Sequence, residues 1–220
     1  MPDIIQPKFS LNGIESNQTL VTISGGFVGY EENPFILQNL SLSIKSRERI
    51  AIQGNNGSGK STLVKAILGD NSIIKQGEWI LPRSQEIGYL DQHYGTLSQD
   101  MTVLDTLSAL LRDRPYLDIR IHLNDFLFRK NEEVAAKVST LSGGEKARLS
   151  LAQIAAITPK LLILDEMTNN LDLETREHVI QVLQNYPGAM LVISHDADFL
   201  TAIGVTDWYD LKDGLLRSIK

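Results

Sequence analysis

The sequence contains no cysteine among its 220 residues. Disulfides, thiolate-bound zinc, iron–sulfur clusters and cysteine nucleophiles are therefore excluded. A reducing compartment is compatible with this composition. The four histidines, at positions 93, 122, 178 and 195, show none of the paired spacings that are typical of metal ligands.

Long apolar stretches are also missing. The strongest run, residues 161–164, is far shorter than the roughly 18 residues that a membrane-spanning helix needs. The N-terminal residues MPDIIQPKFS lack the charged and apolar regions of a signal peptide. We therefore expect a soluble, cytoplasmic protein, for which any membrane-spanning partner would be a separate chain.

Basic residues are fewer than acidic residues in this sequence. The chain has 21 Lys and Arg against 27 Asp and Glu, a net charge of −6. This balance does not support broad adhesion to nucleic acid or anionic lipid, although it allows a local basic patch. The hydrophobic share of 42% and the charged share of 22% are ordinary for a folded globular protein. The length predicts one domain, or one domain with a subdomain.

Hydrophobic patterning predicts strands that alternate with helices after a polar tail or linker end at residues 1–18. Such alternation indicates an α/β fold with a mostly parallel sheet that is covered on both faces. Between residues 102 and 138 the apolar positions recur at helical spacing instead, which predicts a helical insertion. The expected strands are 19–24, 41–45, 49–53, 78–81, 87–90, 161–164, 190–193, 207–211 and 215–219, and the other expected helices are 61–68, 173–183 and 197–202.

One glycine-rich stretch fits the phosphate-binding pattern G-x-x-x-x-G-K-[ST]. Its glycines would let backbone N–H groups approach phosphates, Lys60 would place a charge on the β- and γ-phosphates, and the Ser61 hydroxyl could bind Mg²⁺. A chance glycine turn is the alternative, but the β-rich run before the stretch and the helical run after it favour nucleotide binding. The candidate residues are Gly54, Asn55, Asn56, Gly57, Ser58, Gly59, Lys60, Ser61 and Thr62.

Two acidic residues end the apolar run 161–164. Ligands of parallel sheets bind beyond the carboxyl ends of the strands. Asp165 is therefore a candidate to hold Mg²⁺, through water, and Glu166 to orient or deprotonate an attacking water. Alone, such a pair more often marks a strand end that meets solvent; the phosphate loop in the same chain favours function.

A third motif, Leu141-Ser142-Gly143-Gly144-Glu145, precedes the helical run KARLSLAQIAAI. The spacing of Ser142 and Glu145 is that of a capping box, which is the plain structural interpretation. Glycines are poor helix formers, so two of them in a first turn indicate another use, such as the approach of an anion to exposed amides.

Together these motifs resemble the ATP-binding cassette (ABC) ATPases, over nearly the whole chain from about Leu20. The resemblance implies a P-loop NTPase fold of the ABC type, with a core of residues 19–92 and 159–220 and a helical subdomain at about 93–158. It also implies hydrolysis of Mg·ATP and pairing with a second cassette, in tandem or as a homodimer. The resemblance implies that Tyr30 is the adenine-stacking aromatic, that residues 54–62 are Walker A and that residues 161–166 are Walker B. It implies that Gln92 is the Q-loop ligand of Mg²⁺ and γ-phosphate sensor, and that His195 is the switch histidine. It also implies that residues 141–145 are the signature, which serves the partner's nucleotide, and that Leu171-Asp172 is the D-loop.

Taken alone, Tyr30 is typical of an edge-strand aromatic and His195 of an ordinary loop histidine. The order of the motifs favours the functional interpretation of both. His195 also follows an apolar strand and lies beside Asp196, from where it could reach a γ-phosphate.

The segments LSGGEKARLSLA and DEMTNNLDLETRE resemble the F-type ABC proteins, which pair two cassettes in one chain and lack membrane spans. The sequences FLF at 126–128 and NYPGAMLVISHDADFL are similar to the second cassette of that group. Two residues depart from the F-type pattern: Met167 replaces a proline and Asn170 a histidine. The resemblance implies action on ribosomes, in translation or antibiotic resistance. The alternatives are the ATPase subunit of a membrane transporter and a nucleotide-dependent binding module with slow turnover.

Overall fold

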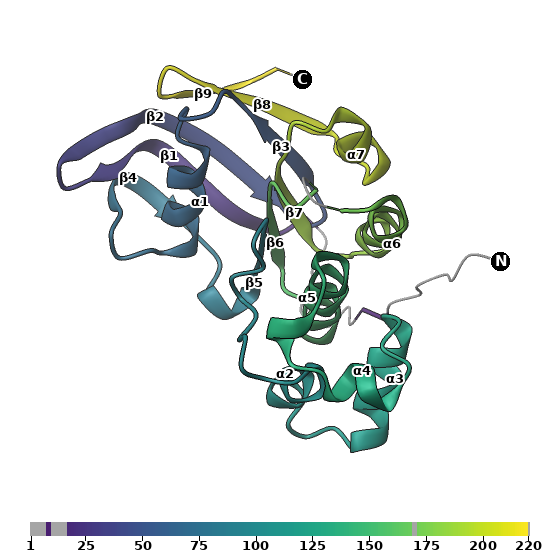
Figure 1. Cartoon of the computed structure of the whole chain (residues 1–220). Coiled ribbons are helices and arrows are strands. Elements are labelled where there is room, and N and C mark those ends of the chain that lie inside the picture. The colour runs from purple at the N-terminus through teal and green to yellow at the C-terminus, as the bar shows by residue number, and fades with distance from the viewer. Residues whose placement is uncertain (1–7, 10–16, 169–170, 220) are drawn as a thin grey trace. The chain divides into compact units, whose positions relative to one another are not determined.

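The computed structural model of the chain describes residues 8–9, 17–168 and 171–219 (Figure 1). Most of the predicted polar tail, residues 1–18, lies outside the described residues. The elements are β1 (Thr19–Tyr30), β2 (Asn33–Lys45), β3 (Arg49–Gln53), α1 (Lys60–Leu68), β4 (Ile74–Ile80), η1 (Ser84–Glu86), β5 (Ile87–Asp91), α2 (Val103–Leu110), α3 (Tyr116–Asp125), α4 (Asn131–Ala135), η2 (Val138–Thr140), α5 (Gly143–Ile157), β6 (Leu161–Asp165), α6 (Leu173–Gln184), β7 (Ala189–Ile193), α7 (Ala197–Ala202), β8 (Asp207–Lys212) and β9 (Leu215–Ser218).

The chain divides into two compact units. Among the described residues, the first, a sheet unit, contains 17–89, Pro159–Glu166 and 188–219. The second, a helical unit, contains 8–9, Leu90–Thr158, 167–168 and 171–187. α6 belongs to the helical unit, whereas the sequence analysis expected it in the core. The reason is that α6 packs on α5, a helix of the same unit.

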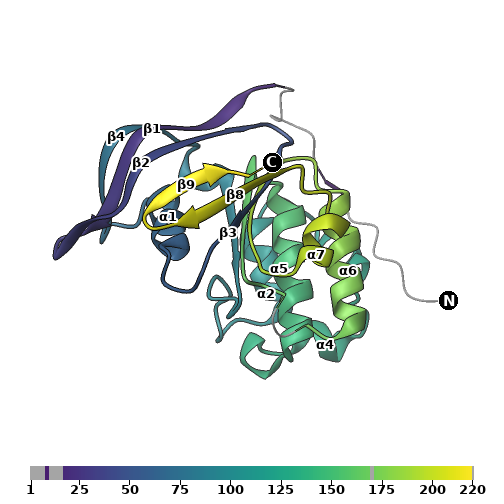
Figure 2. The ribbon, with the colours of Figure 1, turned by 90° about the horizontal axis from the view of Figure 1, so that it is seen from above.

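The main sheet has six strands in the order β5-β6-β7-β3-β8-β9. The pairs β6/β7, β7/β3 and β3/β8 are parallel, and β9 folds back antiparallel on β8 (Figure 2). The expected mostly parallel sheet is confirmed. β6 and β7 are buried along nearly their whole length, as strands of a covered parallel sheet are.

A second sheet, of three antiparallel strands in the order β2-β1-β4, was not predicted. The predicted strands 19–24 and 41–45 were also too short, because β1 continues to Tyr30 and β2 begins at Asn33. Several shifts of register interrupt the pairing of β1 with β2, one of them between Ile23 and Gly26. These irregularities break the period-two alternation from which a strand is read in a sequence.

One hydrophobic cluster joins the two sheets and α1. It contains buried aliphatic residues of β1 and β2, such as Ile23 and Leu37, of α1, such as Leu63, and of the main sheet, such as Ile163 and Leu191. This packing fixes α1 and the loop before it against the ends of the parallel strands.

The helical unit confirms the predicted insertion, which forms α2, α3, α4 and η2. Thr102 caps α2 in a capping box with Asp105, and Pro115 precedes α3. Phe126 and Phe128 are fully buried here, so the FLF sequence packs this unit. Within the described residues no helix is long and apolar enough to cross a lipid bilayer.

Candidate functional site

The phosphate-binding pattern forms the loop between β3, which ends at Gln53, and α1, which begins at Lys60. This strand–loop–helix context is the one that the pattern requires. Gly54 and Gly59 have φ angles of 151° and 105°. A Cβ at Gly54 would lie 2.4 Å from the carbonyl oxygen of Leu211, and one at Gly59 would lie 2.5 Å from Cδ2 of Leu37. Both positions therefore require glycine for close approach as well as for conformation.

Lys60, the first residue of α1, is only 7% exposed. Its Nζ atom donates hydrogen bonds to the carbonyl oxygens of Gly54, at 2.7 Å, and Asn55, at 3.1 Å. The loop therefore wraps around the ammonium group and holds it at the start of α1. Ser61, the next residue, is exposed, and Thr62 is buried.

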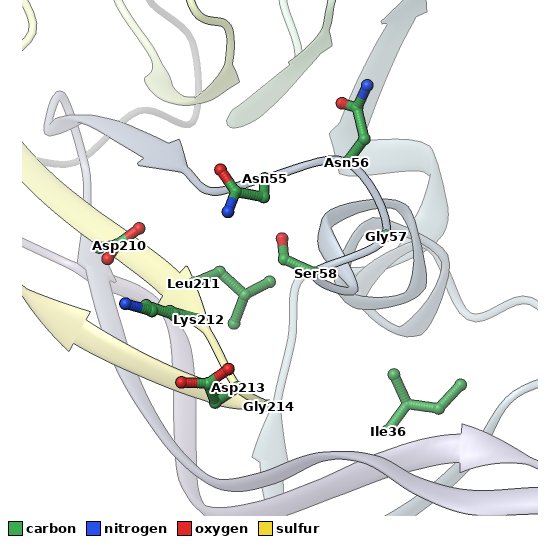
Figure 3. Close-up of a pocket in the computed structure, with 10 residues that line it drawn as sticks. All are labelled: Ile36, Asn55, Asn56, Gly57, Ser58, Asp210, Leu211, Lys212, Asp213 and Gly214. Carbon is green, nitrogen blue, oxygen red and sulfur yellow. The ribbon is translucent and has the colours of Figure 1, made fainter.

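A cavity of about 490 Å³ lies against the loop. Its lining comes from the loop, from β2, from the end of β8 and from the turn to β9: Ile36, Asn55, Asn56, Gly57, Ser58, Asp210, Leu211, Lys212, Asp213 and Gly214 (Figure 3). The buried Ser58 hydroxyl oxygen has no hydrogen-bond partner among the described residues. Lys60, Ser61 and Thr62 do not line this cavity, so the cavity and the ammonium group are separate features of the loop.

The two acidic residues lie where β6 ends. Oδ2 of Asp165 accepts a hydrogen bond from the hydroxyl of Tyr89, at 3.3 Å. Glu166 turns away from the strand: its φ is 51°, its backbone N–H donates to the carbonyl oxygen of Ile193, and its Oε1 lies 4.0 Å from Nε2 of His195. The adjacent carboxylates thus face different partners, one on β5 and one after β7.

His195 follows β7, which is the neighbour of β6 in the sheet. Its side chain is 56% exposed, while that of Glu166 is 31% exposed. β6, β7 and β3 are parallel and adjacent, so their carboxyl ends lie at one edge of the sheet. Glu166, His195 and the phosphate loop all follow these ends, as the sequence predicted for a site at this edge.

The third motif begins α5 in the helical unit. The Ser142 hydroxyl accepts a hydrogen bond from the Glu145 N–H, and Oε2 of Glu145 accepts one from the Ser142 N–H. The expected capping box is confirmed. It fixes the conformation of Ser142–Glu145 and orients the first-turn amides of α5 along the helix axis.

The family model described as "ABC transporter" matches residues 37–169, more than half of the chain. The chain belongs to the ATP-binding cassette family of ATPases. The expected family and fold class are thereby confirmed. The matched segment covers all three motifs: the phosphate loop, the signature at 141–145 and Walker B at 161–166.

Curated relatives at 33–37% identity include F-type members of the family. YdiF of Bacillus subtilis, named a putative ATP-binding protein, is 37% identical over 86% of this chain and 29% of its own length. ABC transporter F family member 5 of Arabidopsis thaliana is 36% identical over 92% of this chain and 29% of its length. ATP-binding cassette sub-family F member 3 of Rattus norvegicus is 33% identical over 86% of this chain and 26% of its length. The cassette thus spans less than a third of each of these three relatives.

Solved structures share the fold. A bacterial Atm1-family ABC exporter with ATP bound superimposes with a TM-score of 0.73 over 98% of this chain and 40% of the exporter chain. The sequence identity of that pair is 21%, so the likeness is one of fold alone.

The remaining motif residues of the cassette lie in both units. Tyr30 ends β1, is half-buried, and its ring centroid lies 5.8 Å from Nζ of Lys65 on α1. Gln92 belongs to the helical unit, and the carboxylate of the preceding residue, Asp91, accepts hydrogen bonds from the N–H groups of His93 and Gly95, which both follow Gln92. Of the two departures from the F-type pattern, Met167 is buried and Asn170 lies outside the described residues.

Sequence reasoning missed Tyr89, the partner of Asp165. Tyr89 lies three residues before Gln92, near the end of β5, and β5 neighbours β6 in the sheet. That adjacency of strands is not visible in the sequence, because β5 and β6 are separated by the whole of α2–α5.

Proposed function

We propose that this cassette binds Mg·ATP at the phosphate loop and hydrolyses it. The observation that carries the proposal is the wrapped ammonium of Lys60, which is held between the carbonyl oxygens of Gly54 and Asn55 at the start of α1. A triphosphate would take the place of those carbonyl oxygens, and the N–H groups after Gly57 and the amino end of α1 would add further positive potential. Thr62 is the last residue of the proposed nucleotide-binding stretch 54–62, and Tyr30 would stack on the adenine.

The chain offers oxygen donors that suit Mg²⁺. Oxygen donors are what this ion prefers, and NTPases supply few of them because phosphates and water complete the shell. Ser61, Gln92 and Asp165 are such donors. When bound, the ion neutralises charge on the transferring phosphoryl group.

We assign the chemical step to Glu166. Its carboxylate faces His195 across 4.0 Å rather than the Asp165 partner Tyr89. From there Glu166 would orient or deprotonate an attacking water, and His195 and Gln92 would respond to the γ-phosphate. Phosphoryl transfer needs mainly positioning and electrostatic stabilisation, which this set of side chains can supply.

The signature Ser142-Gly143-Gly144-Glu145 is proposed to act on the nucleotide of a second cassette. Its first-turn amides form an anion-binding end of α5, and the capping box keeps them oriented. The pairing is with a tandem cassette or a second copy. In light scattering, Glu166→Gln should be monomeric without nucleotide and gain mass with Mg·ATP. A mass that never shifts would contradict pairing between copies.

The biological role that we propose is action on ribosomes, in translation or antibiotic resistance, by a cytoplasmic F-type protein. The F-type relatives and the TNNLD and LSGGEKAR segments support it. The ATPase subunit of a membrane transporter is the second candidate, which the family description "ABC transporter" favours. Co-sedimentation with polysomes, compared with co-purification with membranes, separates the two.

Calorimetric titration with Mg·ATP tests the nucleotide site directly. Lys60→Ala should abolish tight binding, because it removes the main point charge on the phosphates. Lys137→Ala, on the helical unit, is the matched loss of a lysine and should bind like the parent. An affinity of Lys60→Ala within about threefold of the parent would mean that the loop is not the site.

A further inference from the structure

The second glycine of the signature lies in a tight contact between two helices of the helical unit. A Cβ added at Gly144 would lie 2.6 Å from Oγ1 of Thr175 and 3.2 Å from Oδ2 of Asp172. The first distance is shorter than a Cβ contact can be, so the first turn of α6 occupies the space that any other residue at position 144 would need (Figures 1 and 2 show α5 beside α6).

The α6 side of this contact is held in place. Asp172 is the N-cap of α6, and its Oδ1 accepts a hydrogen bond from the Thr175 N–H at 2.9 Å. Its Oδ2 accepts the Thr175 hydroxyl at 2.8 Å. Thr175 is 2% exposed, so its hydroxyl cannot turn to solvent without losing this bond. The group that faces Gly144 is therefore a rigid one.

The same face of α5 continues the contact one turn later. Arg148 lies four residues after Gly144, on the same side of the helix. Its guanidinium carbon lies 5.8 Å from the ring centroid of Phe128, and its charge favours the ionised form of Asp172. The D-loop residue Asp172 thus lies close to the signature helix at Gly144 and is attracted by the charge of Arg148 on the same helix.

We propose that Thr175 is a positioning residue for the signature motif, which it holds through its contact with Gly144, so that the D-loop end of α6 and the first turn of α5 move as one body. The part of this proposal that concerns turnover rests on the proposed function. It gives Gly144 a role within its own chain. The alternative is that glycine is needed there only for the approach of a partner's nucleotide.

Thermal unfolding of the full chain separates these two roles. In open space, Gly→Ala in a helix is neutral or stabilising. The contact instead predicts that Gly144→Ala lowers Tm by about 2–10 °C, because the added methyl overpacks the helix pair. Adding Thr175→Ala, which removes Oγ1, should cancel most of that loss. Adding Thr175→Ser, which keeps Oγ1, should not. The contact would be overturned if the Tm of Gly144→Ala were at or above the parent's. It would also be overturned if the Tm loss of Gly144→Ala/Thr175→Ala equalled the sum of the losses in the two single variants.

Turnover tests the positioning role. In a preparation that contains its partner cassette, or at chain concentrations that allow self-pairing, Thr175→Ala should lower kcat by about two- to thirtyfold. Its KM and its calorimetric affinity for Mg·ATP should stay near the parent's, and Thr175→Ser should restore kcat. Gly144→Ala/Thr175→Ala should turn over faster than Gly144→Ala. An unchanged kcat in Thr175→Ala overturns the proposal. A parent that binds Mg·ATP but never turns over contradicts the proposed function instead, and the thermal cycle still decides the contact.

Discussion

The hydroxyl of Tyr89 donates a hydrogen bond to Oδ2 of Asp165 over 3.3 Å, from β5 to the carboxyl end of β6. This bond turns the Asp165 carboxylate toward β5, whereas the next carboxylate, that of Glu166, lies toward His195 beyond β7. Two neighbouring acids are thus separated by partners on opposite sides of β6 in the sheet order. Under the proposed function, that separation would let Asp165 act on a metal and Glu166 on water.

Tyr89→Phe should weaken the response to Mg²⁺ without abolishing it. Loss of a partner that orients a metal-binding carboxylate typically costs about 10- to 100-fold in metal affinity, and the long 3.3 Å bond predicts the lower end of that range. The measurement is ATP binding or turnover as a function of Mg²⁺ concentration. Tyr116→Phe, an exposed tyrosine of α3, is the control. Equal Mg²⁺ responses in Tyr89→Phe and the parent would show that Tyr89 does not orient Asp165.

Glu166→Gln should keep nucleotide affinity and lose turnover. Removal of a general base typically costs about 10²–10⁴ in rate, while the amide leaves ground-state binding intact. Asp165→Asn should instead shift the Mg²⁺ dependence as well. Single-turnover hydrolysis at saturating Mg²⁺, in a preparation with the partner cassette, compares them. If Glu166→Gln hydrolyses ATP within tenfold of the parent while Asp165→Asn is inactive, the two roles are misassigned.

The parts of the fold that follow from local chemistry could be read from the sequence. The pattern 54–61 forms a loop after a strand and the start of a helix, as its glycine spacing requires, and Ser142 and Glu145 form the capping box that their spacing predicts. Each of these depends on residues within one turn or one loop of each other. The parallel strands were also found, because buried strands are short continuous apolar runs.

The parts that depend on distant segments could not be read in this way. Tyr89 meets Asp165 across 76 residues of sequence, and Thr175 fills the space beside Gly144 from another helix. In the sequence, Gly144 looked like a poor helix former whose use lay in binding an anion. The structure shows a second reason for glycine, the close approach of α6. The three-stranded sheet was missed because bulges hide the alternation of β1.

Tyr30→Ala should weaken the binding of ATP but not that of inorganic triphosphate. If Tyr30 stacks on adenine, its loss removes a contact of about 1–3 kcal/mol that only the base can make. Tyr30→Trp should retain ATP affinity, because a larger ring still stacks. Calorimetric titrations of the three chains with both ligands make the comparison. Equal losses for ATP and triphosphate would mean that Tyr30 supports the loop rather than the base.

The lowered pKa of Asp172 predicts how the stability of the fold changes in acid. Hydrogen bonds from the Thr175 N–H and hydroxyl, with help from the charge of Arg148, hold the pKa of Asp172 below its ordinary value. A carboxylate whose pKa is lowered by folding stabilises the fold at pH values above its unfolded pKa of about 3.9. That contribution is lost as the pH falls through the folded pKa, so the relevant range lies below about pH 4.

Two substitutions separate the charge of Asp172 from its capping bond. At pH 7, Asp172→Ala should cost about 1 kcal/mol, the usual loss of an N-cap, whereas Asp172→Asn keeps an acceptor for the Thr175 N–H and should cost less. Thermal unfolding from pH 7 to pH 3 gives the test. The Tm difference between the parent and Asp172→Asn should narrow below about pH 4, because only the parent has a carboxylate to protonate there. Parallel Tm curves for the two chains down to pH 3 would show that the lowered pKa of Asp172 makes no contribution to stability.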